Sequence, residues 1–322
     1  ANTDALYLTA IDKYGHELWR WTFPVDKLNQ QTEPISFLSI RPTYTETEND
    51  LTVKANKRTF IFSKKDGQLK GVSVDNRKIS FANGPRFIGA RRADRSLDQF
   101  YNHDDEKAKE KDRTYSEFPD AAVFTKLDVK QEGGDLIVTA NYKLGNLDKA
   151  QWTISPSGDL VLDYTYNFSG VVDLMGICFD YPEDQVISKR WLGAGPYRVW
   201  QNRIHGTQYD VWENDYNDPI PGETFTYPEF KGYFGDVSWM NIRTKEGIIS
   251  LTNETPDAYV GVYQPRDGRD RLLYTLPESG ISLLNVIPPV RNKVNSTDLC
   301  GPSSQPKWVN GPQTGRIVFR FI

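Results

Sequence analysis

The feature that most constrains the fold is an alternation of apolar and polar residues with a period of two. Residues 160–168 read LVLDYTYNF, residues 136–144 read LIVTANYKL, and residues 316–321 read RIVFRF. Because successive side chains of a strand point to opposite faces of a sheet, each segment predicts a strand. No ten-residue stretch has the i, i+3, i+4, i+7 spacing of an amphipathic helix. The chain is therefore predicted to be all-β.

Tight turns separate the predicted strands. Asp66-Gly67 falls between residues 59–63 and 68–74, which predicts a hairpin. Gly133-Gly134 precedes one strand, Gly158 separates residues 151–154 from 160–168, and Asp267-Gly268 marks a further turn. Many short strands joined by such turns are typical of a sandwich or barrel.

Three segments depart from this pattern. Residues 1–23 hold two strand-like runs, 6–11 and 18–23, which are too few to bury a core alone. They are predicted either to end a preceding domain or to join the main one. Residues 24–50 are polar and contain prolines, as in a linker, and residues 101–115 have the mixed charge of a solvated loop or short exposed helix. The main domain is predicted over residues 51–322.

Composition excludes several classes of partner. The net charge of −4 and the pI near 5.6 argue against nucleic acid, which needs a concentrated basic face. No apolar run approaches the ~20 residues of a membrane span, and 13% aromatic residues are too many for a disordered chain. Cys178 and Cys300 cannot build a disulfide framework, and whether they pair is left open. Low cysteine use fits the cytoplasm and a bacterial periplasm equally.

The start of the chain indicates processing or a larger parent. Residue 1 is Ala, and the only methionines are Met175 and Met240. The chain is therefore expected to be processed or cut from something longer.

The densest group of aromatic and arginine side chains follows a Gly-Ala-Gly-Pro run at 193–196. Such a run forces a non-repetitive backbone path. Flat aromatic rings beside planar guanidinium groups suit a sugar. The C–H groups of the sugar stack on the ring, and its hydroxyls accept hydrogen bonds from the guanidinium N–H groups. The alternative is a loop whose aromatics close the end of a sandwich. The candidate substrate-binding residues here are Tyr197, Arg198, Trp200, Arg203, His205 and Trp212.

Catalytic residues are not predicted. Nearby carboxylates at Glu213, Asp215, Glu223 and Glu229 would have to converge in a pair for glycoside hydrolysis, and nothing in the sequence shows that they do. A mutarotase would use a histidine with a carboxylate, for which His205 is the best placed. Nucleophile and phosphate motifs are absent, and the few histidines and cysteines are poor material for a zinc site. No cofactor or metal is therefore predicted.

The order of several motifs resembles one family. Residues 191–196 read WLGAGP, and Arg203 stands where the family closes its following motif with arginine. Three further segments occur in the family's order: residues 57–62 (KRTFIF) with 66–69 (DGQL), residues 85–87 (PRF) with Arg91 or Arg92, and residues 283–285 (LLN). The chain resembles the C-terminal small-chain domain of family 2 glycoside hydrolases of the β-galactosidase type. Residues 16–21 (HELWRW) look like the last strands of the immunoglobulin-like domain that precedes it.

The resemblance implies a large antiparallel β-supersandwich over residues 51–322, related in fold to galactose mutarotase, after terminal strands of an immunoglobulin-like domain at 1–23. It implies a non-catalytic domain that walls the substrate pocket and supports assembly, with carbohydrate and the parent's TIM-barrel and immunoglobulin-like domains as partners. The parent would hydrolyse β-glycosidic bonds, with a metal possible there, and this chain alone would be inactive. Asn285 joins the candidate site through the family's W-L-N motif.

Two departures from the family bear on specificity. The family's E-N-Y is Arg198-Val199-Trp200 here, and the tryptophan of its W-L-N is Leu283. The resemblance therefore does not extend to galactose specificity. A stand-alone carbohydrate-binding module and a mutarotase-type epimerase remain as alternative functions.

Overall fold

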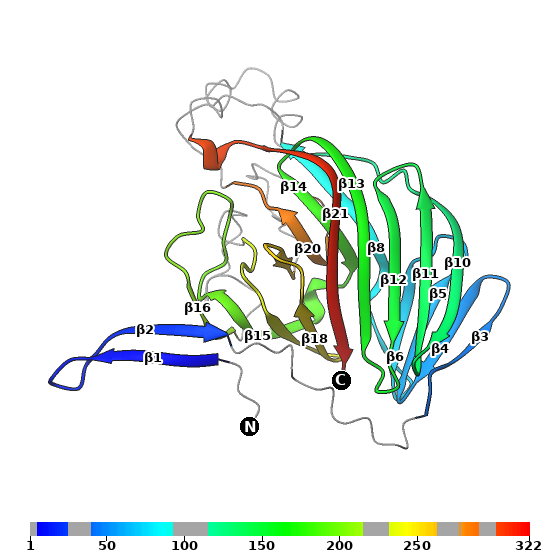
Figure 1. The fold of residues 1–322 in the computed structure, drawn as a ribbon, viewed down its shortest axis with the longest axis horizontal. Helices are drawn as coiled ribbons and strands as arrows, with labels where there is room; N and C mark the ends of the chain where they lie inside the picture. The colour runs from blue at the N-terminus through cyan, green and yellow to red at the C-terminus, as the bar shows by residue number, and fades with distance from the viewer. Residues whose placement is uncertain are drawn as a thin grey trace.

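The structure is a computed structural model that describes residues 5–24, 40–92, 115–214, 232–262, 277, 279–289 and 301–322. Two large antiparallel sheets pack face to face, and a separate two-stranded hairpin lies beside them (Figure 1). Within the described residues there is no α-helix, only short 3-10 turns such as η2 (Glu183–Gln185) and η5 (Pro302–Ser304), and so no helix able to span a membrane. The prediction of an all-β antiparallel sandwich is confirmed.

Among the described residues, the first sheet has nine strands. In spatial order they are β10 (Val123–Glu132), β11 (Asp135–Lys143), β12 (Leu147–Ile154), β13 (Leu160–Val172), β21 (Lys307–Phe321), β18 (Gly247–Asn253), β17 (Trp239–Thr244), β15 (Val186–Gly195) and β16 (Gln208–Asn214). β21 thus lies between β13 and β18, and it pairs with β13 along that strand's whole length, from Leu160↔Phe319 to Val172↔Lys307.

The second sheet has ten strands in the part of the chain that the structure describes. Its main path is β19 (Tyr259–Gly261), β20 (Ile281–Val286), β14 (Leu174–Asp180), β8 (Ala82–Arg92), β6 (Leu69–Val74), β5 (Arg58–Ser63), β4 (Asp50–Ala55) and β3 (Thr43–Glu46). Beside this path β7 (Arg77–Ile79) pairs with β6, and β9 (Tyr115–Glu117) pairs with β8.

Most turn predictions are confirmed. Gly67 has a φ of 75° between β5 and β6, and Gly158 has a φ of 83° between β12 and β13. These left-handed values are ones that glycine adopts without a Cβ penalty. Asp267-Gly268 lies outside the described residues, as do residues 101–114 of the predicted charged loop.

The main core fills the space between the two sheets and is rich in aromatic rings. Phe81 stacks on Phe179 with ring centroids 4.6 Å apart and lies 5.1 Å from Phe319. Phe62 lies 5.9 Å from Trp152 on the opposite sheet. The inner residues of the alternating segments supply this core, because they are the buried half of each strand.

A smaller cluster covers the outer face of the ten-stranded sheet. It contains Ile88, Ala90, Leu174, Cys178 and Leu284 from the sheet, and Val199, Trp200, Tyr233 and Ile287 from segments that cross it. Leu283 and Ile177 belong to the main core, whereas Leu284 and Cys178 beside them belong to this cluster. We call it the outer cluster; it matters for the site because it holds Trp200.

The hairpin of β1 (Ala5–Ile11) and β2 (Glu17–Pro24) stands apart from both sheets. Its contact with the body includes a 2.7 Å hydrogen bond from Tyr7 Oη to Asp210 Oδ1 on β16. That hydrogen bond, followed by partial burial, raises the pKa of Tyr7. The two strand-like runs of residues 1–23 are thus strands, and their origin in an immunoglobulin-like domain stays a prediction.

The predicted linker contains a strand at its end. Residues 43–46 form β3, which pairs with β4 from Thr43↔Lys54 to Glu46↔Leu51. The main domain therefore begins before residue 51, since β3 is an edge strand of the ten-stranded sheet. Residues 25–39 lie outside the described residues.

Candidate functional site

The Gly-x-Gly run at the end of β15 allows close packing on both sides of the strand. A Cβ at Gly193 would lie 3.0 Å from the carbonyl oxygens of Gly235 and Asp236. A Cβ at Gly195 would lie 2.4 Å from the Trp212 ring. A side chain at either position would therefore have to displace its neighbours. The predicted site residue Trp212 packs on this strand, where its Nε1 donates to the Gln208 carbonyl at 3.0 Å.

Phe234 is the centre of the polar and aromatic contacts in this region. Trp191 meets its ring edge-on with centroids 4.9 Å apart. The guanidinium of Arg198 lies 5.1 Å from the Phe234 centroid, and Lys189 Nζ lies 5.9 Å from it. Both distances are within the range of cation–π attraction. Lys189 is fully buried, so two cations with restricted exposure flank one ring.

Trp200 is a packing residue of the outer cluster. Its side chain is 5% exposed and meets Tyr233 edge-on at 5.6 Å. The neighbouring backbone is fixed, because Val199 and Tyr233 exchange hydrogen bonds of 2.7 and 2.8 Å. Both faces of a ring this buried are occupied by protein, so the ring is not available as a sugar platform in this structure.

Tyr197, Arg203 and His205 are the exposed members of the predicted set. Tyr197 is 70% exposed, and Arg203 and His205 are also exposed. The loop that carries them is anchored by Gln201, whose Nε2 donates to the carbonyls of Ser303 and Gln305 at 2.9 and 2.7 Å. Three side chains that suit sugar contact thus lie on a loop that is held to the segment before β21.

Asn285 lies on the other side of the ten-stranded sheet from Trp200. Its Oδ1 accepts a 2.6 Å hydrogen bond from Tyr166 Oη, which crosses between the two sheets. Burial raises the pKa of Tyr166, so its hydroxyl stays protonated as the donor. Because Leu284 beside it belongs to the outer cluster, Trp200 and Asn285 lie against opposite faces of the sheet. The structure therefore does not bring the whole predicted set together.

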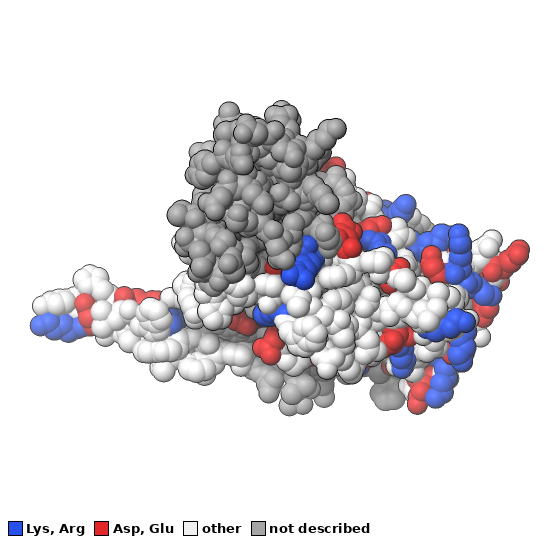
Figure 2. Space-filling model, turned by 90° about the horizontal axis from the view of Figure 1, so that it is seen from above, with Lys and Arg blue, Asp and Glu red and all other residues white. Residues whose placement is uncertain are grey.

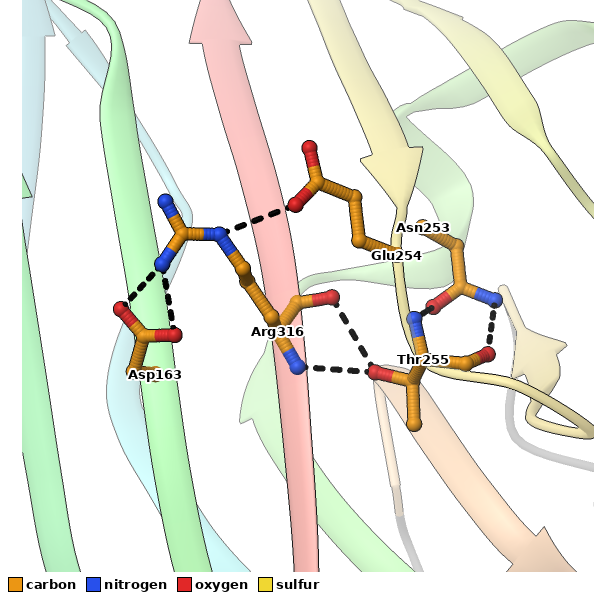
Figure 3. Close-up of polar contacts among 5 residues, drawn as sticks. All are labelled: Asp163, Asn253, Glu254, Thr255 and Arg316. Atoms are coloured by element: carbon orange, nitrogen blue, oxygen red, sulfur yellow. Dashed lines mark hydrogen bonds and ion pairs between the residues drawn. The ribbon is translucent and has the colours of Figure 1, made fainter. Parts of the chain in front are cut away.

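Two carboxylates do converge elsewhere, on the outer face of the nine-stranded sheet (Figure 3). Arg316 Nη1 donates to both oxygens of Asp163 at 2.8 and 2.7 Å, and its Nε donates to Glu254 at 2.9 Å. The Arg316 backbone also exchanges hydrogen bonds with Thr255 Oγ1. Both carboxylates are ion-paired to the same guanidinium, so this arrangement joins strands and does not supply an acid and a base.

The remaining acidic candidates give no catalytic arrangement that can be described. Glu213 is exposed on the edge strand β16, and Asp215, Glu223 and Glu229 lie outside the described residues. Among the described residues, no group of three or more His, Cys, Asp and Glu side chains is placed to hold a metal ion. Cys178 is a free, buried thiol whose pKa burial raises to about 11.

Sequence reasoning missed two kinds of residue in this region. Lys189 was missed because a lysine in an alternating strand is normally solvated, and here it is buried beside Phe234. Tyr233 and Phe234 were missed because they are distant from residues 191–203 in the chain. The Gly235-Asp236 dipeptide that follows Phe234 gives no sign of this long-range contact.

These features define a class of protein: a two-sheet antiparallel sandwich domain with a loop of aromatic and basic residues beside the end of β15. The family model described as beta galactosidase small chain matches residues 54–286. Since this match spans more than half of the chain, the protein belongs to the beta-galactosidase small-chain family.

Other comparisons add little. No curated protein matches the chain. Among solved structures, the chain is similar to a galactose 1-epimerase from Lactobacillus acidophilus NCFM, with 9% identity, 88% of this chain and 99% of that chain covered, and a TM-score of 0.45. It is also similar to a GalM/aldose epimerase homologue from C. elegans, with 8% identity, 87% and 99% covered, and a TM-score of 0.37. We base no argument on similarity of this degree.

Proposed function

We propose that this chain is a non-catalytic domain of a multi-domain β-glycosidase, which walls the substrate pocket and contacts the enzyme's other domains. Membership of the small-chain family supports the association with other domains. The observation that carries the proposal is the apolar face of the β1–β2 hairpin, which needs a covering partner.

The register of the hairpin places its large apolar side chains on one face. Leu6 pairs with Phe23, Leu8 with Trp21, and Ala10 with Trp19. Directly paired residues share a face, so these six side chains form one surface. The opposite face carries Tyr7, Thr9, Arg20 and Thr22, and Tyr7 on that face bonds to the body.

The large apolar side chains of this surface are between 45% and 62% exposed. Trp19, Trp21 and Phe23 are 49%, 45% and 49% exposed, and Leu6 and Leu8 are 62% and 57% exposed. The three rings alone leave roughly 300 Å² of apolar surface in solvent, the size of a patch that marks an interaction site. Figures 1 and 2 show the hairpin projecting from the body, with charged side chains at its tip and along one edge and uncharged surface beside them. We propose that a β-sheet of a preceding immunoglobulin-like domain covers it.

A matched pair of substitutions tests this interface by sedimentation over a wide range of protein concentration. With its partner domain absent, the chain should self-associate through the apolar face. Leu8→Glu should keep it monomeric, whereas Thr9→Glu, one residue away on the polar face, should not. Equal behaviour of Leu8→Glu and the unchanged chain would mean that this face is not an interface.

The non-catalytic claim is tested with aryl β-glycosides. The chain should show no hydrolysis above the buffer rate. Hydrolysis that is abolished by a single carboxylate substitution, such as Glu213→Gln, would overturn the claim.

The pocket-wall role belongs to the exposed part of the candidate site. We propose that Tyr197, Arg203 and His205 contact the saccharide, because their side chains reach solvent from an anchored loop. Calorimetry with neutral β-glycosides should show weak binding that Arg203→Ala reduces. Binding that is unchanged in Tyr197→Ala, Arg203→Ala and His205→Asn would remove these residues from the pocket.

A further inference from the structure

Trp308 lies on the outer face of β21, where a second binding surface can be described. Its side chain is 71% exposed. The residues that alternate with it point into the sandwich farther along the strand, where Ile317, Phe319 and Phe321 are fully buried. Trp308 therefore does not serve the core.

The three residues beside Trp308 on its face of β13 and β21 are uncharged, and two of them are polar. On the partner strand β13, Val171 lies opposite Trp308, and Ser169 lies opposite Asn310. Ser169 Oγ donates to Asn310 Oδ1 at 2.8 Å. This bond orients the carboxamide, so that its Nδ2 group is the part left to donate to a ligand. Residues 308–314 and 167–171 contain no Asp, Glu, Lys, Arg or His.

We propose that Trp308, with Asn310 and Ser169, binds a neutral saccharide. One face of a pyranose has C–H groups that pack on an indole, and its hydroxyls match an amide and a hydroxyl at the side. Residues two apart on a strand stand about 6.5 Å apart, which is the scale of one sugar ring. A protein partner would need several neighbouring apolar side chains, and among the described residues of this row Val171 is apolar whereas Asn310 and Ser169 are polar.

This surface is distinct from the proposed pocket wall, although the two are connected. Gln201, in the loop of Tyr197 and Arg203, bonds to the carbonyls of Ser303 and Gln305, just before β21 begins. A saccharide could bind Trp308 whether or not that loop walls a pocket. The proposal therefore goes beyond the proposed function and can fail independently of it.

The test follows the indole NMR signal of Trp308, assigned by its loss in Trp308→Phe, during titration with lactose and cellobiose. The signal should shift saturably. Trp308→Ala should weaken binding by on the order of tenfold, Asn310→Ala should weaken it less, and Trp308→Tyr should largely keep it. Trp19→Ala, which removes an exposed indole from the hairpin, is the matched control and should leave saccharide binding unchanged.

Three results would overturn the proposal. The first is a Trp308 signal that does not move with either disaccharide. The second is saccharide binding that is equal in Trp308→Ala and the unchanged chain. The third is that Trp308→Ala changes sedimentation and not saccharide binding, because Trp308 would then belong to a protein interface. Loss of binding in Tyr197→Ala alone would leave Trp308 without the assigned role and would support the pocket wall.

Discussion

Replacing Trp200 by Ala tests whether this residue holds the outer cluster together. The ring is 5% exposed, meets Tyr233 at 5.6 Å and belongs to the same buried cluster as Leu174 and Leu284 of the ten-stranded sheet. Removing a fully packed tryptophan costs the lost burial of the ring and leaves a cavity, together about 3–5 kcal/mol. The expected result is a fall of this size in the free energy of unfolding, without a change in the two large sheets.

Urea unfolding measured by tryptophan-independent circular dichroism gives this number. The midpoint should fall while the denaturant slope stays the same. Tyr197→Ala, three residues away and 70% exposed, is the control and should change stability by less than about 0.5 kcal/mol. A cost below about 1 kcal/mol for Trp200→Ala, together with loss of saccharide binding, would refute the packing role and restore Trp200 as a sugar platform.

Three further outcomes follow from the described contacts. Burial disfavours the charged form of the Asp159 carboxylate, but two 2.7 Å hydrogen bonds from Arg320 outweigh this effect and lower the pKa of Asp159. The stability that the Asp159 carboxylate contributes is therefore present above about pH 4 and is lost as the pH falls through its pKa in the folded protein. Arg320→Ala should therefore cost about 1–2 kcal/mol at pH 7 in chemical unfolding, a modest value because Arg320 is half exposed, and little at pH 2. In a Cys300→Ala background, Cys178 should not react with a thiol reagent at pH 8 until the chain is unfolded, since burial raises its pKa to about 11; rapid native labelling would contradict this. Gly176→Ala should lower the thermal midpoint sharply, because its Cβ would lie 2.1 Å from a backbone carbonyl oxygen of β20, whereas Gly71→Ala, which meets nothing within 4 Å, should not.

The strands could be predicted from the sequence because their signal is local. The alternating run at 160–168 begins at the first residue of β13, and the run at 136–144 falls on β11, because burial of one face selects every second residue. Asp66-Gly67 fixes a hairpin by the backbone it permits. The order of the strands within each sheet could not be predicted from such local signals. β21 lies between β13 and β18, more than 130 residues from the first of these, and no local pattern encodes that pairing.

The candidate site could be predicted only in part, for a related reason. The composition of residues 191–203 correctly marked a region where rings and cations gather, and Trp191, Arg198 and Phe234 do meet there. Which ring faces solvent depends on a second apolar layer outside the ten-stranded sheet. That layer comes from β8, β14 and β20, so its existence cannot be read from the loop itself.

The two tryptophans at 200 and 308 differ in burial although both lie in described parts of the same domain. Trp200 lies in the segment richest in functional signals, yet the sheet beneath it is apolar, so burying its ring is worth more than leaving it for a ligand. Trp308 lies in an ordinary alternating strand, yet its side chain points to the outer face of the nine-stranded sheet, where it is 71% exposed. Exposure of each ring is therefore set by the face of the sheet on which it lies and by whether a second apolar layer covers that face. On that reasoning, the exposed Tyr197, Arg203, His205 and Trp308 are the groups through which this domain would contact carbohydrate.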